Sequence, residues 1–338
     1  MPKKVIIYYT DIGKNPSLDN LDVLEEAEFV SRNLKELGYS PKNLPFIYNT
    51  KRLKTEIKKI KPEFIFNLVE SIGGTDSLMY LAPLIFDHLK IPYTGCPTKS
   101  LFQTSDKLIT KEILNQNGIN TPKYLSLDNH DKLEKPLEQG RIERGEKFLI
   151  KYAKEHSSVG IDERDLILFE DWGEITERLK EKHGEKYFAE QYIEGREFNI
   201  SLLGNPITVL PIAEMKFSNY PDEKPKIVGY RAKWNKESFE YNHTKRSFDF
   251  GENENPLLKN LEEICIKCWN LFGLKGYARI DFRVDGNNIP YVLEINANPC
   301  ISPDAGFIAS AERAELSHTK VIEKIIEDIN KKENPNLF

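Results

Sequence analysis

Two strands joined by a short turn within residues 276–299 constrain the fold of this chain more than any other feature of its sequence. Apolar and polar residues alternate in both strands, which indicates a hairpin with one face on a core. The residues expected on the apolar face are Ala278, Ile280, Phe282, Val284, Leu293 and Ile295. Those expected on the polar face are Arg279, Asp281, Arg283, Glu294 and Asn296. A turn centred between residues 287 and 288 predicts that Asp281 lies opposite Glu294 and Arg279 opposite Asn296.

The opposed carboxylates of Asp281 and Glu294 are the clearest chemical signal in this hairpin. Directly opposed side chains of antiparallel strands approach to about 5 Å, and like charges at that distance repel each other. A cation between them removes the repulsion, and an oxygen-rich set of Asp, Glu and Asn suits magnesium with bound phosphates. The same polar face is also typical of the solvated side of a half-buried sheet. The hairpin alone therefore leaves two interpretations open, the metal site of a nucleotide-dependent enzyme and an exposed face.

The composition is that of a globular protein with two or three domains. The chain has 338 residues, of which 39% are hydrophobic and 30% charged, so large cores can form. A net charge of −5 with interspersed signs gives no field suited to nucleic acid or an anionic membrane, and neither is expected as a partner. The four cysteines are few and irregularly spaced, which favours reduced thiols in the cytoplasm. Cys265 and Cys268 are expected on one packed face of a helix rather than at a metal.

Residues 1–98 carry an alternation of strands and helices. Strands are expected at residues 3–9 and 64–69, and helices at residues 22–37, 51–60 and 78–89. This alternation predicts a doubly wound, mostly parallel sheet. Further along, a polar and aromatic stretch at residues 217–250 separates two strand-rich parts. An insertion of this length indicates either a cover over an active site or a disordered segment.

Six stretches along the chain follow the order of those in a known family. They are residues 91–95 (IPYTG), Asp106 with Lys107, Lys151 with residues 157–160 (SSVG), residues 190–197, residues 276–281 and residues 294–299 (EINANP). Together they resemble the D-alanine–D-alanine ligase branch of the ATP-grasp superfamily. The resemblance implies a Rossmann-like domain at residues 1–98, followed by two α+β domains, residues 99–188 and 189–338, that sandwich ATP under a lid at about residues 217–250. It also implies an ADP-forming ligase, in which ATP phosphorylates a carboxylate and an amine attacks the acyl phosphate.

The resemblance assigns nucleotide contacts residue by residue. Lys107 and Lys151 match the lysines that hold the α- and β-phosphates, and Lys233 matches the lid lysine that reaches the γ-phosphate. A loop that covers the phosphates with its backbone N–H groups corresponds to Ser157, Ser158 and Val159. The strand expected to meet adenine comprises Glu190, Gln191, Tyr192 and Ile193. Glu197 falls where the family places the ribose carboxylate, although an exposed glutamate at a loop edge is a rival interpretation.

The same resemblance places the chemistry at the hairpin. Arg279 and the backbone N–H of Cys300 match groups that face the developing oxyanion. Asp281, Glu294 and Asn296 match the ligands of two magnesium ions, with Mn2+ as an alternative. The residues expected to act in catalysis are Arg279, Ser157 and Lys233. The implied cofactors are therefore ATP and Mg2+, the implied partners are small amino acids or peptides, and relatives often form homodimers.

The sequence departs from this family where the substrates should bind. Asp22 stands near the position of the glutamate for the first substrate's ammonium group, but an acid at a helix start also complements the helix dipole. Glu70 follows a buried strand where the family has a histidine, and it could hold an ammonium ion or another cation. Trp234 replaces a lid tyrosine, and Cys300 stands where glycine is usual.

A further departure concerns the carboxylate of the second substrate. The usual serine–leucine pair is missing, which leaves Ser302 or the backbone of Ala305 and Gly306 for that role. These departures predict a ligase of amino-acid-like substrates, at least one of which differs from D-alanine. The alternatives are a true D-alanine–D-alanine ligase, an ATP-grasp kinase and a non-catalytic nucleotide sensor. The sensor is disfavoured because the metal ligands and Arg279 are present.

Overall fold

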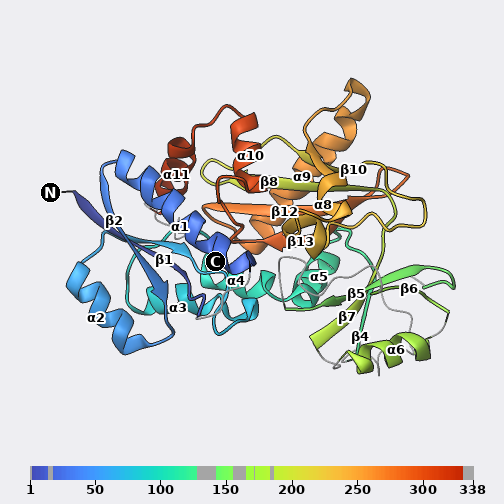
Figure 1. The fold of residues 1–338 in the computed structure, drawn as a ribbon, viewed down its shortest axis with the longest axis horizontal. Coiled ribbons are helices and arrows are strands. Elements are labelled where there is room, and N and C mark those ends of the chain that lie inside the picture. Colours follow the sequence, from blue (N-terminus) through green and yellow to red (C-terminus); the bar gives the residue numbers. More distant parts are fainter. Residues whose placement is uncertain are drawn as a thin grey trace.

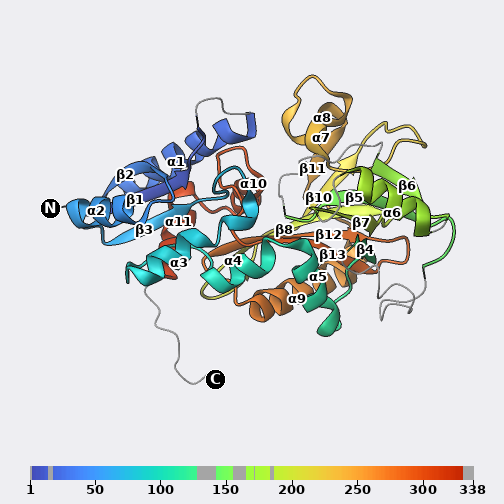
Figure 2. The ribbon, with the colours of Figure 1, turned by 90° about the horizontal axis from the view of Figure 1, so that it is seen from below.

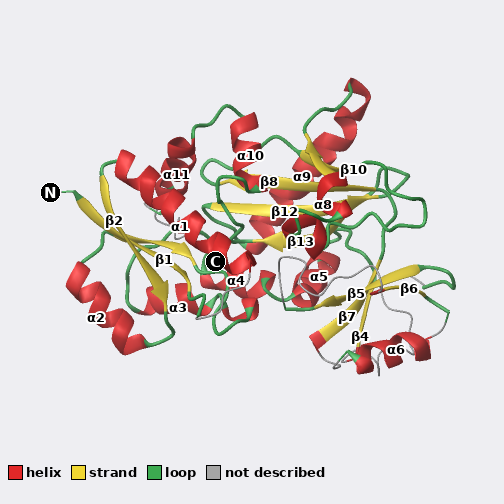
Figure 3. Cartoon of the chain, viewed as in Figure 1, coloured by secondary structure: helices red, strands yellow, loops and turns green. Residues whose placement is uncertain are grey.

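The described part of the chain, taken from a computed structural model, folds into three β-sheets with helices packed around them (Figures 1 and 3). The structure describes residues 2–13, 18–127, 142–154, 165–170, 172–182 and 186–329, without the side chains of residues 18–20, 172 and 234. In Figure 1 the first sheet lies at one end of the molecule and the second at the other end, and the third sheet extends from the middle toward the second.

The first sheet confirms the doubly wound arrangement predicted for the start of the chain. Its strands are β1 (Lys3–Thr10), β2 (Tyr39–Phe46) and β3 (Phe64–Leu68), which run parallel in the order β2–β1–β3. The helices between and after them are α1 (Leu18–Glu36), α2 (Thr50–Ile60), the short 3-10 helix η1 (Asp76–Leu78) and α3 (Leu81–His88). Successive side chains of β1 point to opposite faces, so Val5 and Ile7 pack with α1 while Ile6 and Tyr8 pack with α2 and α3.

The end of the described chain packs against its beginning. Helices α10 (Gly306–Arg313) and α11 (His318–Glu327) share one hydrophobic cluster with α1, and they lie beside it in Figure 1. Phe307 of α10 and Ile322 of α11 are fully buried in that cluster. The sequence also predicts a C-terminal helix at about residues 317–330, which corresponds to α11, whereas α10 was not predicted. This packing brings the loop before α10 next to the first sheet.

The second sheet is antiparallel, with strand order β4–β7–β5–β6. Its strands are β4 (Tyr124–Ser126), β5 (Lys147–Tyr152), β6 (Leu166–Leu168) and β7 (Tyr187–Gln191). Helix α6 (Trp172–Glu181) covers one face through Ile175 and Leu179. The domain boundaries predicted near residues 98 and 188 stay predictions, and the second of them lies inside β7.

The third sheet has the order β11–β10–β8–β12–β13, and β9 pairs with β8. Its strands are β8 (Arg196–Leu203), β9 (Thr208–Val209), β10 (Ala213–Phe217), β11 (Thr244–Ser247), β12 (Tyr277–Val284) and β13 (Pro290–Asn296). The 3-10 helix η5 (Glu252–Glu254) precedes α9 (Asn255–Phe272), and α4 (Thr98–Thr104) and α5 (Lys107–Gln116) also adjoin this sheet. Cys265 and Cys268 of α9 are both buried in its core, as predicted for one packed helix face.

The hairpin of β12 and β13 has the predicted register far from its turn but a different register next to the turn. Asp281 lies opposite Glu294, and residue 279 lies opposite residue 296. Toward the turn, Val284 lies opposite Pro290, so the turn is one residue shorter than predicted. A bulge restores the register, because Leu293 is an extra residue between two paired positions.

This bulge overturns one predicted face. Leu293 was expected on the apolar side together with Ile295. Instead Val292 and Ile295 are buried in the core, while Leu293 is half-buried and stands outside that cluster. The physical reason is that two residues of β13 oppose one of β12 at the bulge, so the strict alternation of faces is interrupted there.

The polar and aromatic stretch at residues 217–250 is ordered into short elements. It contains α7 (Tyr230–Trp234), α8 (Phe239–His243) and β11. Figure 2 shows α7 and α8 standing beyond the ends of β10 and β11. This observation excludes the alternative that the stretch is disordered. Among the described residues, no helix has both the length and the apolar character needed to cross a membrane.

Candidate functional site

Asp281 of β12 lies at the centre of a group of polar side chains. Arg279 donates to both of its carboxylate oxygens, from Nε at 2.8 Å and from Nη2 at 2.9 Å. The amides of Asn199 and Asn296 donate to it at 2.8 and 3.2 Å. Only 8% of Asp281 is exposed, so these donors offset the cost of burying a carboxylate.

Glu294 faces the same place from the neighbouring strand. Its Oε1 lies 3.1 Å from Nζ of Lys107. The position of Lys107 follows from local sequence, because the Asp106 side chain caps α5 by accepting the N–H of Leu108 at 2.9 Å. Lys107 is therefore the first residue of the helix, and its side chain reaches from α5 to the hairpin.

The oxygen donors of this group fit a divalent cation that also binds phosphates. Asn296 donates through its nitrogen to Asp281, which leaves its Oδ1 as an acceptor. Together with the carboxylates of Asp281 and Glu294, this oxygen completes a hard, oxygen-only set of the kind that magnesium prefers. In the structure Lys107 pairs with Glu294 and Arg279 with Asp281, so each of the two carboxylates already has a cation beside it.

A second polar group joins α5 to the second sheet. Glu190 of β7 is 2% exposed and pairs with two lysines. Nζ of Lys111 lies 2.7 Å from Glu190 Oε1, and Lys151 of β5 binds the other carboxylate oxygen. Lys111 also donates to Thr121 Oγ1 at 2.8 Å, and that hydroxyl donates to the carbonyl of Val292 at 2.8 Å. The group thus connects the predicted adenine strand to the hairpin.

Lys111 was missed by the sequence analysis. It is fully buried, and burial lowers its pKa to about 8 even though Glu190 opposes that shift. Burial alone would raise the pKa of Glu190, but the charges of Lys111 and Lys151 outweigh it and hold the pKa below its usual value. The signal available in the sequence was the spacing of Lys111 one turn after Lys107, on the side of α5 that also buries Leu114.

Glu197 and the residues after β7 are organised by Arg283. This arginine, 4% exposed, lies 3.3 Å from Glu197 and donates to the carbonyl of Ile193 at 2.9 Å. Its guanidinium also lies over Tyr192, with the guanidinium carbon 5.2 Å from the centre of the ring. Gln191 donates to Glu146 at 3.0 Å. Burial raises the pKa of Glu197, an effect that Arg283 opposes. The rival interpretation of Glu197 as an exposed loop residue is wrong, because only 9% of it is exposed.

The turn between β7 and β8 requires glycine at residue 195. Gly195 has φ +143°, and a Cβ added there would lie 2.0 Å from the carbonyl oxygen of Val284. We expect Gly195→Ala to lower the free energy of unfolding by more than about 1 kcal/mol, since an L side chain can occupy neither the space nor the backbone conformation. Urea unfolding would measure the loss. The matched control is Gly286→Ala, where no atom lies within 4 Å, and equal stability of the two variants would contradict the prediction.

The segment predicted as a lid brings Lys233 to the hairpin. Burial and the nearby Arg279 lower the pKa of Lys233, whereas Asp281, Glu294 and Glu197 raise it. The backbone of Trp234 ends α7, and its side chain lies outside the described part. The predicted phosphate-covering residues Ser157, Ser158 and Val159 also lie outside the described residues.

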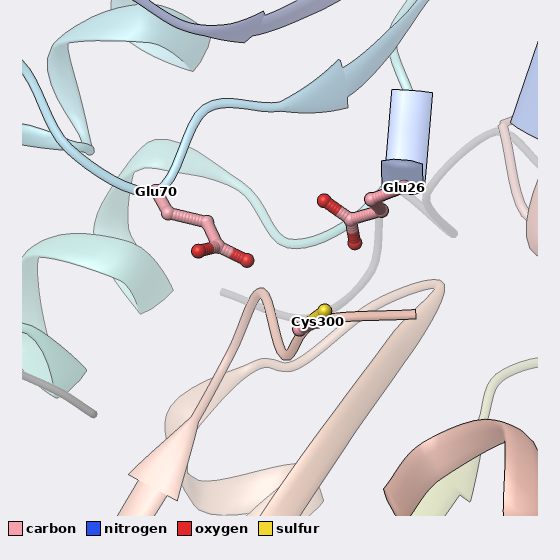
Figure 4. Close-up of side chains that lie close together, drawn as sticks. All are labelled: Glu26, Glu70 and Cys300. Atoms are coloured by element: carbon pink, nitrogen blue, oxygen red, sulfur yellow. The ribbon is translucent and has the colours of Figure 1, made fainter. Parts of the chain in front are cut away.

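Four side chains from distant parts of the chain form what we call the acidic cluster: Asp22, Glu26, Glu70 and Cys300. Asp22 and Glu26 lie one turn apart on α1. Glu70 follows β3 and Cys300 follows β13, and both lie close to Glu26 in Figure 4. Ligand atoms of Glu26, Glu70 and Cys300 all lie within 4.8 Å of one another. Cys300 Sγ donates to Asp22 Oδ2 at 3.0 Å. Three of these residues were predicted from the sequence, whereas Glu26 was not.

The remaining predicted substrate residues lie around the start of α10. Ser302 is 1% exposed and donates to Asp22 at 3.3 Å and to Asp304 at 3.2 Å. Ala305 is the N-cap residue of α10, and Gly306 is its first residue. A Cβ added at Gly306 would lie 3.0 Å from Nη2 of Arg246, so this arginine, which was not predicted, reaches the helix start.

The fold and the site together define an ATP-grasp protein. Glu197 interacts electrostatically with Lys151 of the second sheet and with Asp281 of the third, so the two sheets face one site. The family model described as "D-ala D-ala ligase C-terminus" matches residues 113–327, more than half of the chain. The chain therefore belongs to the D-alanine–D-alanine ligase family, as the sequence analysis predicted.

Known relatives agree with this membership over nearly the whole chain. The D-alanine–D-alanine ligase of Aquifex aeolicus is 28% identical over 309 residues, which cover 90% of this chain and 94% of the relative. The crystal structure of the D-alanine–D-alanine ligase from Bacillus anthracis complexed with ATP is 21% identical, with a TM-score of 0.69 over 97% of both chains. The VanG D-Ala:D-Ser ligase from Enterococcus faecalis is 17% identical, with the same TM-score over 97% of this chain and 100% of its own. These two solved structures share the fold.

Proposed function

We propose that this chain is an ATP-dependent, ADP-forming ligase that joins a carboxylate to an amine through an acyl phosphate. The observation that carries the proposal is the cross-strand pair of Asp281 and Glu294, each held by a cation and set beside Arg279. Membership of the D-alanine–D-alanine ligase family supports the same reaction. The substrates that we propose are amino-acid-like, and at least one differs from D-alanine.

We assign the nucleotide to the space between the second and third sheets. Lys107 and Lys151 would hold the α- and β-phosphates, and Lys233 the γ-phosphate. The residues after β7 would meet adenine, and Glu197 would meet the ribose. Asp281, Glu294 and Asn296 would hold two magnesium ions, which supply neutralisation of the phosphate charge when bound. The roles of residues 157–159 stay predictions.

We assign the reacting carboxylate to the end of the hairpin beside Arg279 and the backbone N–H of Cys300. Both carboxylate oxygens of Asp281 bind Arg279, which fixes the guanidinium before any substrate arrives. Arg246, beside Gly306, would hold the carboxylate of the second substrate in place of the missing serine–leucine pair. An arginine suits this role because its guanidinium binds carboxylates through two parallel hydrogen bonds.

A coupled ADP-release assay over pairs of amino acids and dipeptides tests the function. We expect ADP release that requires both a carboxylate and an amine, together with a condensed product by mass spectrometry. Turnover with D-alanine alone would reject the clause on altered substrates. A stable phosphorylated product without consumption of an amine would instead identify a kinase.

Two further expectations accompany the proposal. We place the reaction in the cytoplasm, in keeping with four cysteines that are all free thiols in the structure. We also propose a homodimer, which analytical ultracentrifugation would detect. Neither expectation enters the assignment of the site.

A further inference from the structure

The acidic cluster contains an acceptor that the fold itself does not satisfy. Glu26 is 1% exposed, and its Oε1 accepts the N–H of Ile301 at 2.7 Å. Its Oε2 is buried and makes no hydrogen bond among the described residues. Figure 4 shows this carboxylate pointing toward Glu70 and Cys300. A buried carboxylate oxygen without a donor is costly, which indicates that the fold reserves it for a ligand that donates.

The charges around this oxygen are of one sign. Burial raises the pKa of Glu26, and Glu70 and Asp22 raise it further, while the backbone N–H of Ile301 lowers it. The same three carboxylates raise the pKa of the Cys300 thiol after burial itself. The charged side chains that shift the pKa values of Glu26 and Cys300 most are therefore carboxylates, and none of them is a lysine or an arginine. A ligand that fits here must bring positive charge.

A primary ammonium group fits the cluster better than a metal ion does. An ammonium group brings its own charge and three N–H donors, and it needs only acceptors. Oxygens of Glu26, Glu70 and Asp22 provide such acceptors from two different elements. A metal held by Glu26, Glu70 and Cys300 would first require the Cys300 thiol to lose its proton, and burial together with these carboxylates raises the pKa of that thiol.

The number of carboxylates exceeds what a single ammonium group can balance. Here three carboxylates converge beside Cys300, which itself interacts electrostatically with Arg279 at the reacting end of the hairpin. One ammonium group would leave an excess of negative charge, whereas two would come close to balance.

We propose that the acidic cluster selects a substrate with two ammonium groups, namely a diamino acid such as lysine or a peptide that carries one. This inference rests on the proposed ligase function. Glu26 and Asp22 on α1 receive one ammonium group, and Glu70 after β3 receives the other. The carboxylate of the same substrate then lies toward Arg279.

The test compares lysine with norleucine, which has the same chain length but lacks the terminal ammonium group. Both enantiomers are offered with Mg-ATP and a panel of amines, and ADP release is measured. We expect lysine to be preferred in kcat/KM, and Glu70→Gln to reduce that preference by about tenfold, the effect of one charged hydrogen bond. The matched control is Glu63→Gln at the other end of β3, which should keep the preference. Thermal unfolding checks that both variants fold.

The outcomes separate this inference from the proposed function. Equal use of lysine and norleucine with ADP release intact overturns the inference and leaves the ligase standing. If no amino acid or dipeptide supports ADP release, the ligase proposal fails, and a calorimetric titration with lysine then decides the inference alone. If the wild-type protein binds lysine and the Glu70→Gln variant does not, the inference is supported. If the wild-type protein does not bind lysine, or the variant binds it equally well, the inference is overturned. Titration with Zn2+ alone completes the comparison, because zinc uptake in place of lysine uptake would make the cluster a metal site.

Discussion

Replacing Glu294 by glutamine should lower ATP-dependent turnover by about a hundred- to a thousandfold, the range seen when one preorganised charge is removed from an active site. Glutamine keeps the shape of the side chain but removes the negative charge that faces Lys107 and lies opposite Asp281. The proposed metal would lose one of its two carboxylate ligands. We therefore also expect the Mg2+ concentration needed for half-maximal ADP release to rise.

The fold of this variant should be preserved, because glutamine keeps the size of the side chain and its amide oxygen can still accept a hydrogen bond from Lys107. The matched control is Glu56→Gln, which removes an ion pair with Arg52 at 2.8 Å on α2, far along the chain from the hairpin. That variant should retain turnover. Normal ADP release by the Glu294 variant at low Mg2+ would count decisively against the proposed metal site.

The parts of the fold that could be predicted are those set by local pattern. The continuous apolar run of residues 5–8 predicts a strand buried on both sides, and the structure shows one. Alternation at residues 277–284 predicts the strand β12 but not its burial, because every residue of β12 except Arg279 is buried. The register of the hairpin was predicted because the pairing of Asp281 with Glu294 depends on strand periodicity. The bulge at Leu293 was not predicted. The shorter turn and the extra residue at the bulge shift the register in opposite directions, so the pairing of Asp281 with Glu294 is unchanged.

The residues that were missed are charged side chains whose role depends on partners far away in sequence. Arg283 was placed on the polar face, but its burial follows from carbonyl groups more than 50 residues away. Glu26 looks like an ordinary helical glutamate until the loop after β13 packs against α1. A role for Arg246 follows only from the fold, which places it beside Gly306. Each is a tertiary contact between polar groups, which leaves no periodic signal in a single sequence.

Lys111 shows how such a residue ties the nucleotide strand to the catalytic hairpin. It is fully buried, and it holds Glu190 on β7 at 2.7 Å and Thr121 at 2.8 Å, which in turn binds the backbone of β13. We expect Lys111→Met to lower the free energy of unfolding by about 3 kcal/mol, because it leaves a buried carboxylate with one cation fewer. This cost is at the lower end for a broken buried pair, since Lys151 remains bound to Glu190.

The same substitution should weaken ATP binding, because Lys151 would be drawn more firmly to Glu190 and withdrawn from the phosphates. Urea unfolding and ATP titration would measure the two effects. Lys111→Arg keeps the charge and serves as a comparison that should retain most of the affinity. In a double-mutant cycle, Lys111→Met should lower the free energy of unfolding much less in a Glu190→Gln background. The reason is that the glutamine in this background carries no charge that would need Lys111 as a partner. An equal cost in both backgrounds would show that Lys111 acts through packing rather than through Glu190.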